Sequence, residues 1–75
     1  QDRAREMLLM GLRLTEGIDA DRFAARTGMA LEAALDGGVL EQAIEEGYLL
    51  REGGRVAATA EGRLRLDALL AALVV

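Results

Sequence analysis

The sequence contains no cysteine, no histidine and no proline, and its only aromatic residues are one Phe and one Tyr. Without cysteine, the chain offers no disulfide, no thiolate ligand for a metal and no ligand for an iron–sulfur cluster. Without histidine, it lacks the usual general base and the commonest metal ligand. The nine basic residues are all arginine and thirteen residues are acidic, so the net charge is −4. This balance opposes a general affinity for nucleic acid or for anionic membranes.

The composition is that of a globular protein. Hydrophobic residues make up 52% of the 75 residues and charged residues 29%. Fourteen leucines and fourteen alanines must therefore supply most of the core, which suits close packing of helices. No apolar run approaches the ~20 residues that a membrane-spanning helix needs. We expect a single domain over residues 1–75, and because the chain opens on Gln1 rather than on Met, we expect it to be a fragment of a larger protein.

The first helix is predicted from apolar residues that recur with helical spacing between Ala4 and Leu14. We expect it to end near Thr15, with Gly17 as a left-handed C-cap and Ile18 packing back on the last turn. Gly11 interrupts this pattern and costs about 1 kcal/mol relative to alanine inside a helix. Two interpretations are open: a tolerated glycine, or a glycine that allows another backbone to approach closely.

Three further helical segments are expected, at residues 20–27, 29–35 and 39–46. Asp19 is the predicted N-cap of the first of these, and Gly28 ends it. Gly37–Gly38 is expected to separate the second segment from the third, which Gly47 caps.

The only sheet we expect is a hairpin formed by residues 48–51 and 55–58 around Gly53–Gly54. In this register Glu52 faces Arg55, and Arg51 faces Val56. Thr59 is predicted to cap one last helix over residues 60–74, whose buried stripe consists of Leu66, Leu69, Leu70 and Leu73. The fold class is therefore mainly α, a winged helix-turn-helix-like domain with four or five short helices and one hairpin.

No catalytic residue and no metal site is predicted. The paired carboxylates Asp19 with Asp21 and Glu45 with Glu46 are better explained by helix capping and by a solvated helix face than by acid–base chemistry. We interpret Met7 and Met10 as core filler. DNA binding is disfavoured because the third long helix carries only acidic charged side chains, namely Glu41, Glu45 and Glu46.

Arg13 is the residue that we single out for a possible contact with a carboxylate. Its place near the end of the first helix is electrostatically favourable by itself. The other interpretation is a guanidinium that binds a carboxylate on a ligand or on another part of a parent protein.

A Met- and Leu-rich helix and the three motifs that follow it in order resemble a known terminal domain. The first is G-L-R-x-x-x-G-[IV], from Gly11 to Ile18; the second is G-[LY]-L, at Gly47; the third is L-T-x-x-G-R, matched at Thr59, Gly62 and Arg63. Together they resemble the C-terminal domain of the oxygen-independent coproporphyrinogen III oxidase family, especially its heme-chaperone-like members, over nearly the whole chain. The sequence departs from the third motif at Ala58, where leucine is usual, and at Ala60, where proline is common.

This resemblance implies a cytoplasmic parent of the radical S-adenosylmethionine class, whose barrel holds a [4Fe–4S] cluster and S-adenosylmethionine. Such a parent is either an oxidoreductase of porphyrin biosynthesis or a heme chaperone. The segment itself would hold no cofactor. It would pack on the catalytic barrel and cover the porphyrin site, with Arg13 contacting a propionate or an interdomain carboxylate. The alternatives are a winged-helix DNA-binding regulator and a plain protein-interaction module.

Overall fold

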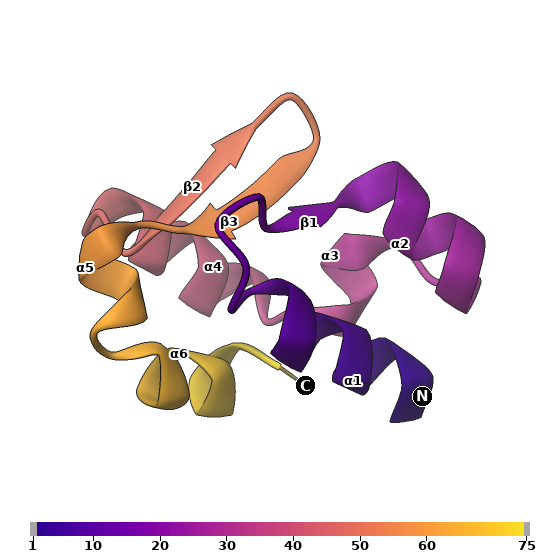
Figure 1. The fold of residues 1–75 in the computed structure, drawn as a ribbon, viewed down its shortest axis with the longest axis horizontal. Coiled ribbons are helices and arrows are strands. Elements are labelled where there is room, and N and C mark those ends of the chain that lie inside the picture. The colour runs from indigo at the N-terminus through magenta and orange to yellow at the C-terminus, as the bar shows by residue number, and fades with distance from the viewer. Residues whose placement is uncertain (1, 75) are drawn as a thin grey trace.

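The structure is a computed structural model that describes residues 2–74 and contains six helices and three strands in that range (Figure 1). In chain order they are α1 (Asp2–Gly11), β1 (Ile18–Asp19), α2 (Ala20–Thr27), α3 (Leu31–Ala34), α4 (Gly37–Glu45), β2 (Leu49–Glu52), β3 (Arg55–Ala58), α5 (Ala60–Arg63) and α6 (Leu66–Leu73). The predicted mainly α class is confirmed, as is the order of helices and hairpin.

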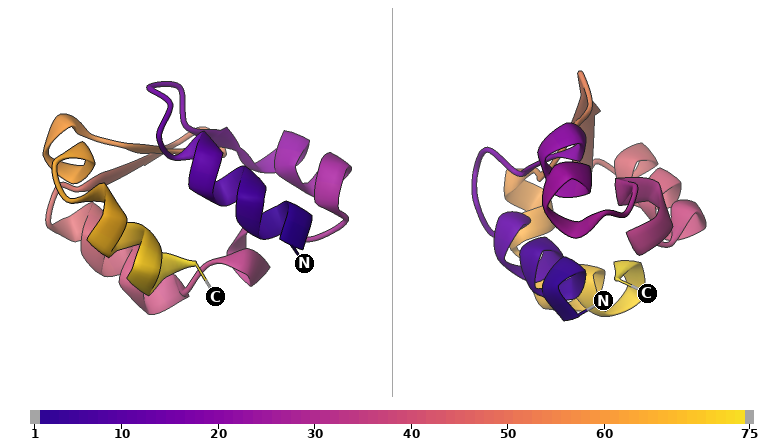
Figure 2. Two further views of the ribbon diagram at one scale, coloured as in Figure 1. Left: turned by 60° about the horizontal axis from the view of Figure 1, so that its bottom comes forward. Right: turned by 90° about the vertical axis from the view of Figure 1, so that its right-hand side faces the viewer.

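The small antiparallel sheet has the strand order β1-β3-β2, and α1 and α6 lie below it in the view of Figure 1. Helix α4 packs against α6, and α1 packs against α2 at the other end of the domain. The tip of the β2–β3 hairpin projects away from the helices (Figures 1 and 2). Strand β1 lies along β3 close to the end of α1, which places α1, β1 and α2 around one corner of the domain (Figure 1).

Leucine and alanine do fill most of the core. Phe23 and Leu73 have no exposed surface, and the β-branched side chains that are buried among residues 3–74 are Ile18 and Val56. The buried hydrophobic residues are Ala4, Leu8, Leu12, Ile18, Phe23, Leu31, Ala34, Leu35, Leu40, Ala43, Leu49, Val56, Ala58, Leu66, Leu70 and Leu73.

Several local predictions are confirmed. Asp19 caps α2, its side chain accepting a hydrogen bond from the Arg22 backbone N–H at 3.1 Å. At the end of α4, Gly47 has a φ of +83°, and the N–H of Tyr48 donates to the Ala43 carbonyl at 2.8 Å. This is the hydrogen-bond pattern of a Schellman cap. The hairpin has the predicted register, with Glu52 opposite Arg55.

The end of α1 was predicted wrongly. The helix ends at Gly11 rather than near Thr15, and the following residues form tight turns in which the N–H of Leu14 donates to the Gly11 carbonyl at 3.1 Å. Gly17 is therefore not a helix cap. Its φ of +74° occurs in the turn before β1, and a Cβ there would collide with the Val56 carbonyl oxygen of β3. Glycine is needed at this position both for the backbone conformation and for the close approach.

Gly11 provides space for a side chain rather than for another backbone. A Cβ at Gly11 would lie 2.5 Å from Cγ1 and 3.0 Å from Cδ1 of Ile18. The predicted packing of Ile18 against the first helix is thus present, and the missing Cβ of Gly11 makes it possible.

The sheet has a third strand that the sequence analysis missed. Strand β1 is only two residues long, with Ile18 opposite Val56 and Asp19 opposite Arg55. The N–H of Ala20 extends the contact by donating to the Gly54 carbonyl at 2.8 Å. Two residues show no periodicity, so this strand depends on the tertiary contact between Ile18 and the core.

The boundary between α3 and α4 also differs from the prediction. Gly37–Gly38 does not separate the two helices; it forms the start of α4. The Asp36 side chain caps this helix by accepting a hydrogen bond from the Val39 N–H at 3.1 Å. The two helices are separated before the glycines, at Leu35, whose backbone is extended and forms an antiparallel β-bridge with Val74.

The predicted last helix is in fact two helices. Thr59 caps α5 as predicted, accepting from the Gly62 N–H at 3.0 Å. The chain then leaves the helical conformation at Arg65, whose φ is −130° and ψ is 34°. This break redirects α6 so that Leu66, Leu70 and Leu73 are buried, while Leu69 is only partly buried.

Candidate functional site: a groove between α1, β1 and α2

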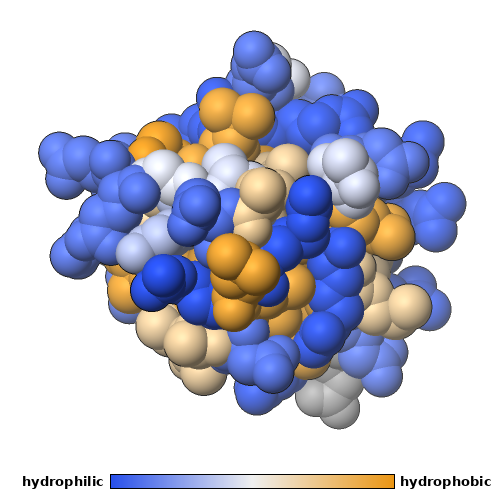
Figure 3. All heavy atoms as spheres, turned by 60° about the vertical axis from the view of Figure 1, so that its left-hand side comes forward, coloured by the Kyte–Doolittle hydropathy of each residue, from blue (hydrophilic) through white to orange (hydrophobic). Residues whose placement is uncertain are grey.

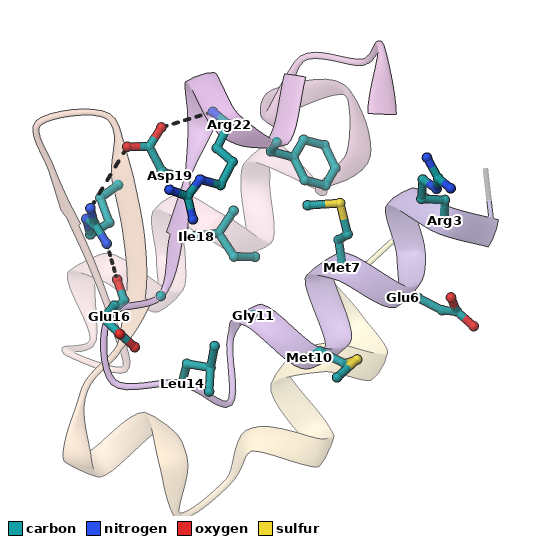
Figure 4. Close-up of a pocket in the computed structure, with 13 residues that line it drawn as sticks. Arg3, Glu6, Met7, Met10, Gly11, Leu14, Glu16, Ile18, Asp19 and Arg22 are labelled. Carbon is teal, nitrogen blue, oxygen red and sulfur yellow. Dashed lines mark hydrogen bonds and ion pairs between the residues drawn. The ribbon is translucent and has the colours of Figure 1, made fainter. Parts of the chain in front are cut away.

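A half-open groove of about 430 Å³ lies between α1, β1, α2 and the start of β3. Figure 4 shows its side chains. This volume lies within the range of small-molecule sites, roughly 300–1,000 Å³. Its apolar lining residues are Met7, Met10, Gly11, Leu14, Ile18 and Phe23, and its charged ones are Arg3, Glu6, Glu16, Asp19, Arg22 and Arg55.

One wall of the groove is an exposed apolar side of α1 and the turn that follows. Met10 is 70% exposed and Leu14 is 55% exposed, whereas Met7 is partly buried. The interpretation of both methionines as core filler was therefore wrong for Met10. Met7 and Met10 are three residues apart in α1, which places them on one side of the helix, and Leu14 lines the same groove from the turn that follows. Two large apolar side chains are thus open to solvent beside a hollow.

The opposite end of the groove is closed by an ion pair and a helix cap. Arg55 donates from Nη1 to the Glu16 carbonyl at 3.0 Å, and its Nη2 lies 3.9 Å from Oδ2 of Asp19. The hydrogen bond from the Arg22 backbone N–H lowers the pKa of Asp19, and the positive charges of Arg55 and Arg22 lower it further. Asp19 is therefore ionised at neutral pH and serves as a cap and as a partner of Arg55.

Arg22 differs from Arg55 because its guanidinium is free in the groove. The side chain extends from the first turn of α2 over Ile18 (Figure 4). Residues 3–74 provide it with no ion pair and no side-chain hydrogen bond. The groove therefore combines an apolar wall with two arginines, Arg3 and Arg22, to which residues 3–74 provide no ion pair.

Arg13, the arginine singled out from the sequence, lies outside this groove. Its Nε donates to the Leu9 carbonyl at 3.1 Å, and its Nη2 lies 3.6 Å from Oδ1 of Asp67 on α6. The two side chains are 55% and 94% exposed, so this ion pair is solvated. Arg13 thus already has a carboxylate partner within its own chain. Its contact with a ligand or with another domain stays a prediction.

Comparison with protein-family models gives a match to "HemN C-terminal domain" over residues 1–65. The chain belongs to this family. The resemblance inferred from the three motifs is thereby confirmed. Comparison with curated proteins and comparison with solved structures each give no significant match.

The motif residues of this HemN C-terminal domain lie at two junctions of the fold. At the first, Ile18 packs on Gly11, and Gly17 passes against β3. At the second, Thr59 Oγ1 donates to the Gly47 carbonyl at 2.6 Å, and Gly62 lies against the backbone of Tyr48. The motifs therefore include residues that fix where helices meet the sheet, and none of these contacts involves a reactive group.

The cofactors of a radical S-adenosylmethionine parent do not fit this HemN C-terminal domain. The chain has no cysteine for a [4Fe–4S] cluster. Among the side chains of residues 3–74, no group of three or more acidic, histidine or cysteine residues comes together as a metal site. No helix in the described range is long and apolar enough to cross a membrane.

The hairpin arginines are engaged within the domain. Arg51 Nη2 lies 3.2 Å from Oε2 of Glu41 on α4, and Arg55 pairs with Asp19 as described above. Glu45 and Glu46 remain exposed on α4 and at its end. The charged side chains that α4 and its C-terminal end expose are therefore carboxylates, which phosphates would repel.

The face of the HemN C-terminal domain shown in Figure 3 has a different character from the groove. Apolar atoms emerge there at several separate places between hydrophilic side chains. Scattered apolar residues of this kind are normal on a protein surface. The groove is distinguished by an apolar wall next to an unpaired charge.

Proposed function

We propose that this chain is the accessory C-terminal domain of a HemN-like parent, in which it packs on the catalytic barrel and covers the porphyrin site. The family match over residues 1–65 is the observation that carries the proposal. The parent would be a cytoplasmic radical S-adenosylmethionine protein, either a coproporphyrinogen oxidase or a heme chaperone. Its barrel would hold the [4Fe–4S] cluster and S-adenosylmethionine, since the present chain lacks the ligands for them.

The physical contribution of the domain is shape and exclusion of water. Radical intermediates require a closed, dry site, because water and other solutes would otherwise react with them. A domain without a reactive centre of its own is suited to this task. Sixteen buried hydrophobic side chains among residues 3–74 give it a core. The apolar wall formed by Met10 and Leu14 supplies a surface that can exclude water from an apolar substrate.

The experiment compares the full-length parent with a version truncated immediately before Gln1. We expect the truncated barrel to keep its iron–sulfur absorption, because the cluster ligands lie outside this domain. We expect it to lose affinity for coproporphyrin III and to lose turnover or heme transfer, whichever activity the parent has. Unchanged porphyrin affinity and unchanged activity in a truncated parent with an intact cluster would refute the proposal.

Arg13 is a candidate contact within this proposal. Because its ion pair with Asp67 is solvated, the guanidinium can exchange this partner for a propionate or for an interdomain carboxylate at little cost. An Arg13→Ala parent that keeps its fold, its porphyrin affinity and its turnover would remove this role.

A further inference from the structure

We infer that the groove between α1, β1 and α2 is a binding site for a carboxylate on a flat apolar body, and that Arg22 is the residue that binds the carboxylate. Within the function proposed above, on which the identity of the ligand rests, that ligand is a propionate-bearing edge of the tetrapyrrole. The inference concerns Arg22 alone, because Arg13 does not line this groove.

The charge of the groove supports a carboxylate. Of the arginines that line it, Arg55 is occupied by Asp19 and by the Glu16 carbonyl. Arg3 also has no ion pair among residues 3–74, but it lies near the N-terminal end of α1, whereas Arg22 lies over Ile18 (Figure 4). Arg22 is left without an ion pair by residues 3–74, although its charge is near enough to lower the pKa of Asp19. Glu6 lines the outer edge and points away from Arg22 (Figure 4). An arginine held beside an apolar wall binds a carboxylate through charge-assisted, often bidentate hydrogen bonds.

The apolar wall supports a ligand with a hydrophobic body. Met10 and Leu14 are more than half exposed, so a ligand that covers them removes apolar surface from water. Methionine adapts its shape to an irregular or flat partner and makes favourable contacts with aromatic rings. A free phosphate or a small hydrophilic acid would use Arg22 but would leave this wall exposed.

The size and openness of the groove support partial enclosure. The volume of about 430 Å³ is open on one side, so the domain holds one edge of a large ring and leaves the other edge to a facing surface. This is the geometry expected of a domain that covers a site instead of forming the whole of it.

The test is a fluorescence titration of the 75-residue chain with coproporphyrin III, with folding checked by far-UV circular dichroism. Arg22→Gln is expected to weaken binding by roughly tenfold, the loss of one charge-assisted contact at a partly exposed site. Arg22→Lys keeps the charge and is expected to restore part of the affinity. The matched control is Arg5→Gln, because Arg5 is exposed on α1 and does not line the groove. It should change affinity by less than about twofold.

A second pair of probes separates the carboxylate from the apolar body. Pyrenebutyrate and the neutral pyrenebutanol share the same ring, and we expect the carboxylate to bind the chain roughly tenfold more tightly. Arg22→Gln should abolish this difference in affinity, while Met10→Gln should weaken the binding of both probes by the same factor.

Three results would overturn the inference: equal affinities for Arg22→Gln and Arg5→Gln, equal binding of the two pyrene probes, or no binding of any probe by the folded chain. The last result would indicate that the groove contacts protein instead. The truncation experiment measures the parent and does not depend on these titrations of the 75-residue chain. The groove can therefore be refuted as a binding site while the proposed function is supported, and the reverse.

Discussion

Replacing Gly62 by alanine tests the contact that joins α5 to the start of the hairpin. Gly62 is buried inside α5, and a Cβ there would overlap the carbonyl oxygen of Tyr48. This same carbonyl accepts the Thr59 N–H at 3.0 Å and lies 3.1 Å from Thr59 Oγ1. The methyl group therefore forces apart two backbone segments that are also joined by hydrogen bonds.

The magnitude follows from two opposing effects. Overpacking of a well-packed site costs up to about 3 kcal/mol, whereas alanine gains about 1 kcal/mol over glycine in a helix. We expect the free energy of unfolding to fall by roughly 2 kcal/mol, a large share of the roughly 4–11 kcal/mol typical of a 75-residue domain. The melting temperature should fall by roughly 8–16 °C.

The matched control is Gly37→Ala, because Gly37 is also helical but a Cβ there would meet no atom within 4 Å. We expect this variant to be as stable as the natural chain or more stable by up to about 1 kcal/mol. Urea unfolding followed by far-UV circular dichroism measures both variants. If Gly62→Ala were as stable as Gly37→Ala, the packing argument for the second junction would be refuted.

Three further predictions concern single side chains. Thr59→Ala removes the α5 cap and the hydrogen bond from the Thr59 hydroxyl to the Gly47 carbonyl, so the free energy of unfolding should fall by about 1–2 kcal/mol. A fall no larger than that caused by Thr15→Ala, at an exposed position, would contradict the role of the cap. The pKa of Asp19 is lowered in the folded chain, so its stabilisation is present above the unfolded pKa of about 3.9 and disappears as the pH falls below that value. Urea midpoints measured from about pH 5 to about pH 2 should therefore fall more steeply in the natural chain than in Asp19→Asn, and equal slopes would argue against the lowered pKa. Arg13→Gln removes only a solvated ion pair and should change stability by less than about 0.5 kcal/mol in urea unfolding; a loss above ~1 kcal/mol would show that the pair is stronger than its exposure implies.

Local signals in the sequence were sufficient for much of the fold. Asp19 and Gly28 delimit α2, and Gly53–Gly54 determines the hairpin register, because capping side chains and left-handed glycines act over a few residues. These predictions did not require knowledge of the tertiary contacts between helices and strands.

Two of the errors arise where a distant contact decides the local conformation. Strand β1 forms because Ile18 pairs with Val56, far away in the sequence. The last helical segment breaks at Arg65 because α5 is held against Tyr48 while α6 packs on α4. Apolar periodicity continues through this break, so the sequence pattern alone predicts one helix.

The candidate groove was missed for a related reason. Met7, Met10 and Leu14 have the spacing of a core-facing stripe, and nothing in that spacing shows that Met10 and Leu14 face solvent. Arg22 resembles any other charged residue in a first helical turn. Its significance depends on the ion pair between Arg55 and Asp19, which occupies the neighbouring charges and leaves Arg22 free.

The central claim is that this domain shields a porphyrin site on a parent chain. Quenching of bound coproporphyrin III fluorescence by iodide tests it most directly, with the full-length parent compared with the parent truncated before Gln1. The account predicts that removal of the domain makes the bound porphyrin several times more accessible to iodide. Equal quenching of the porphyrin in the two proteins would contradict it.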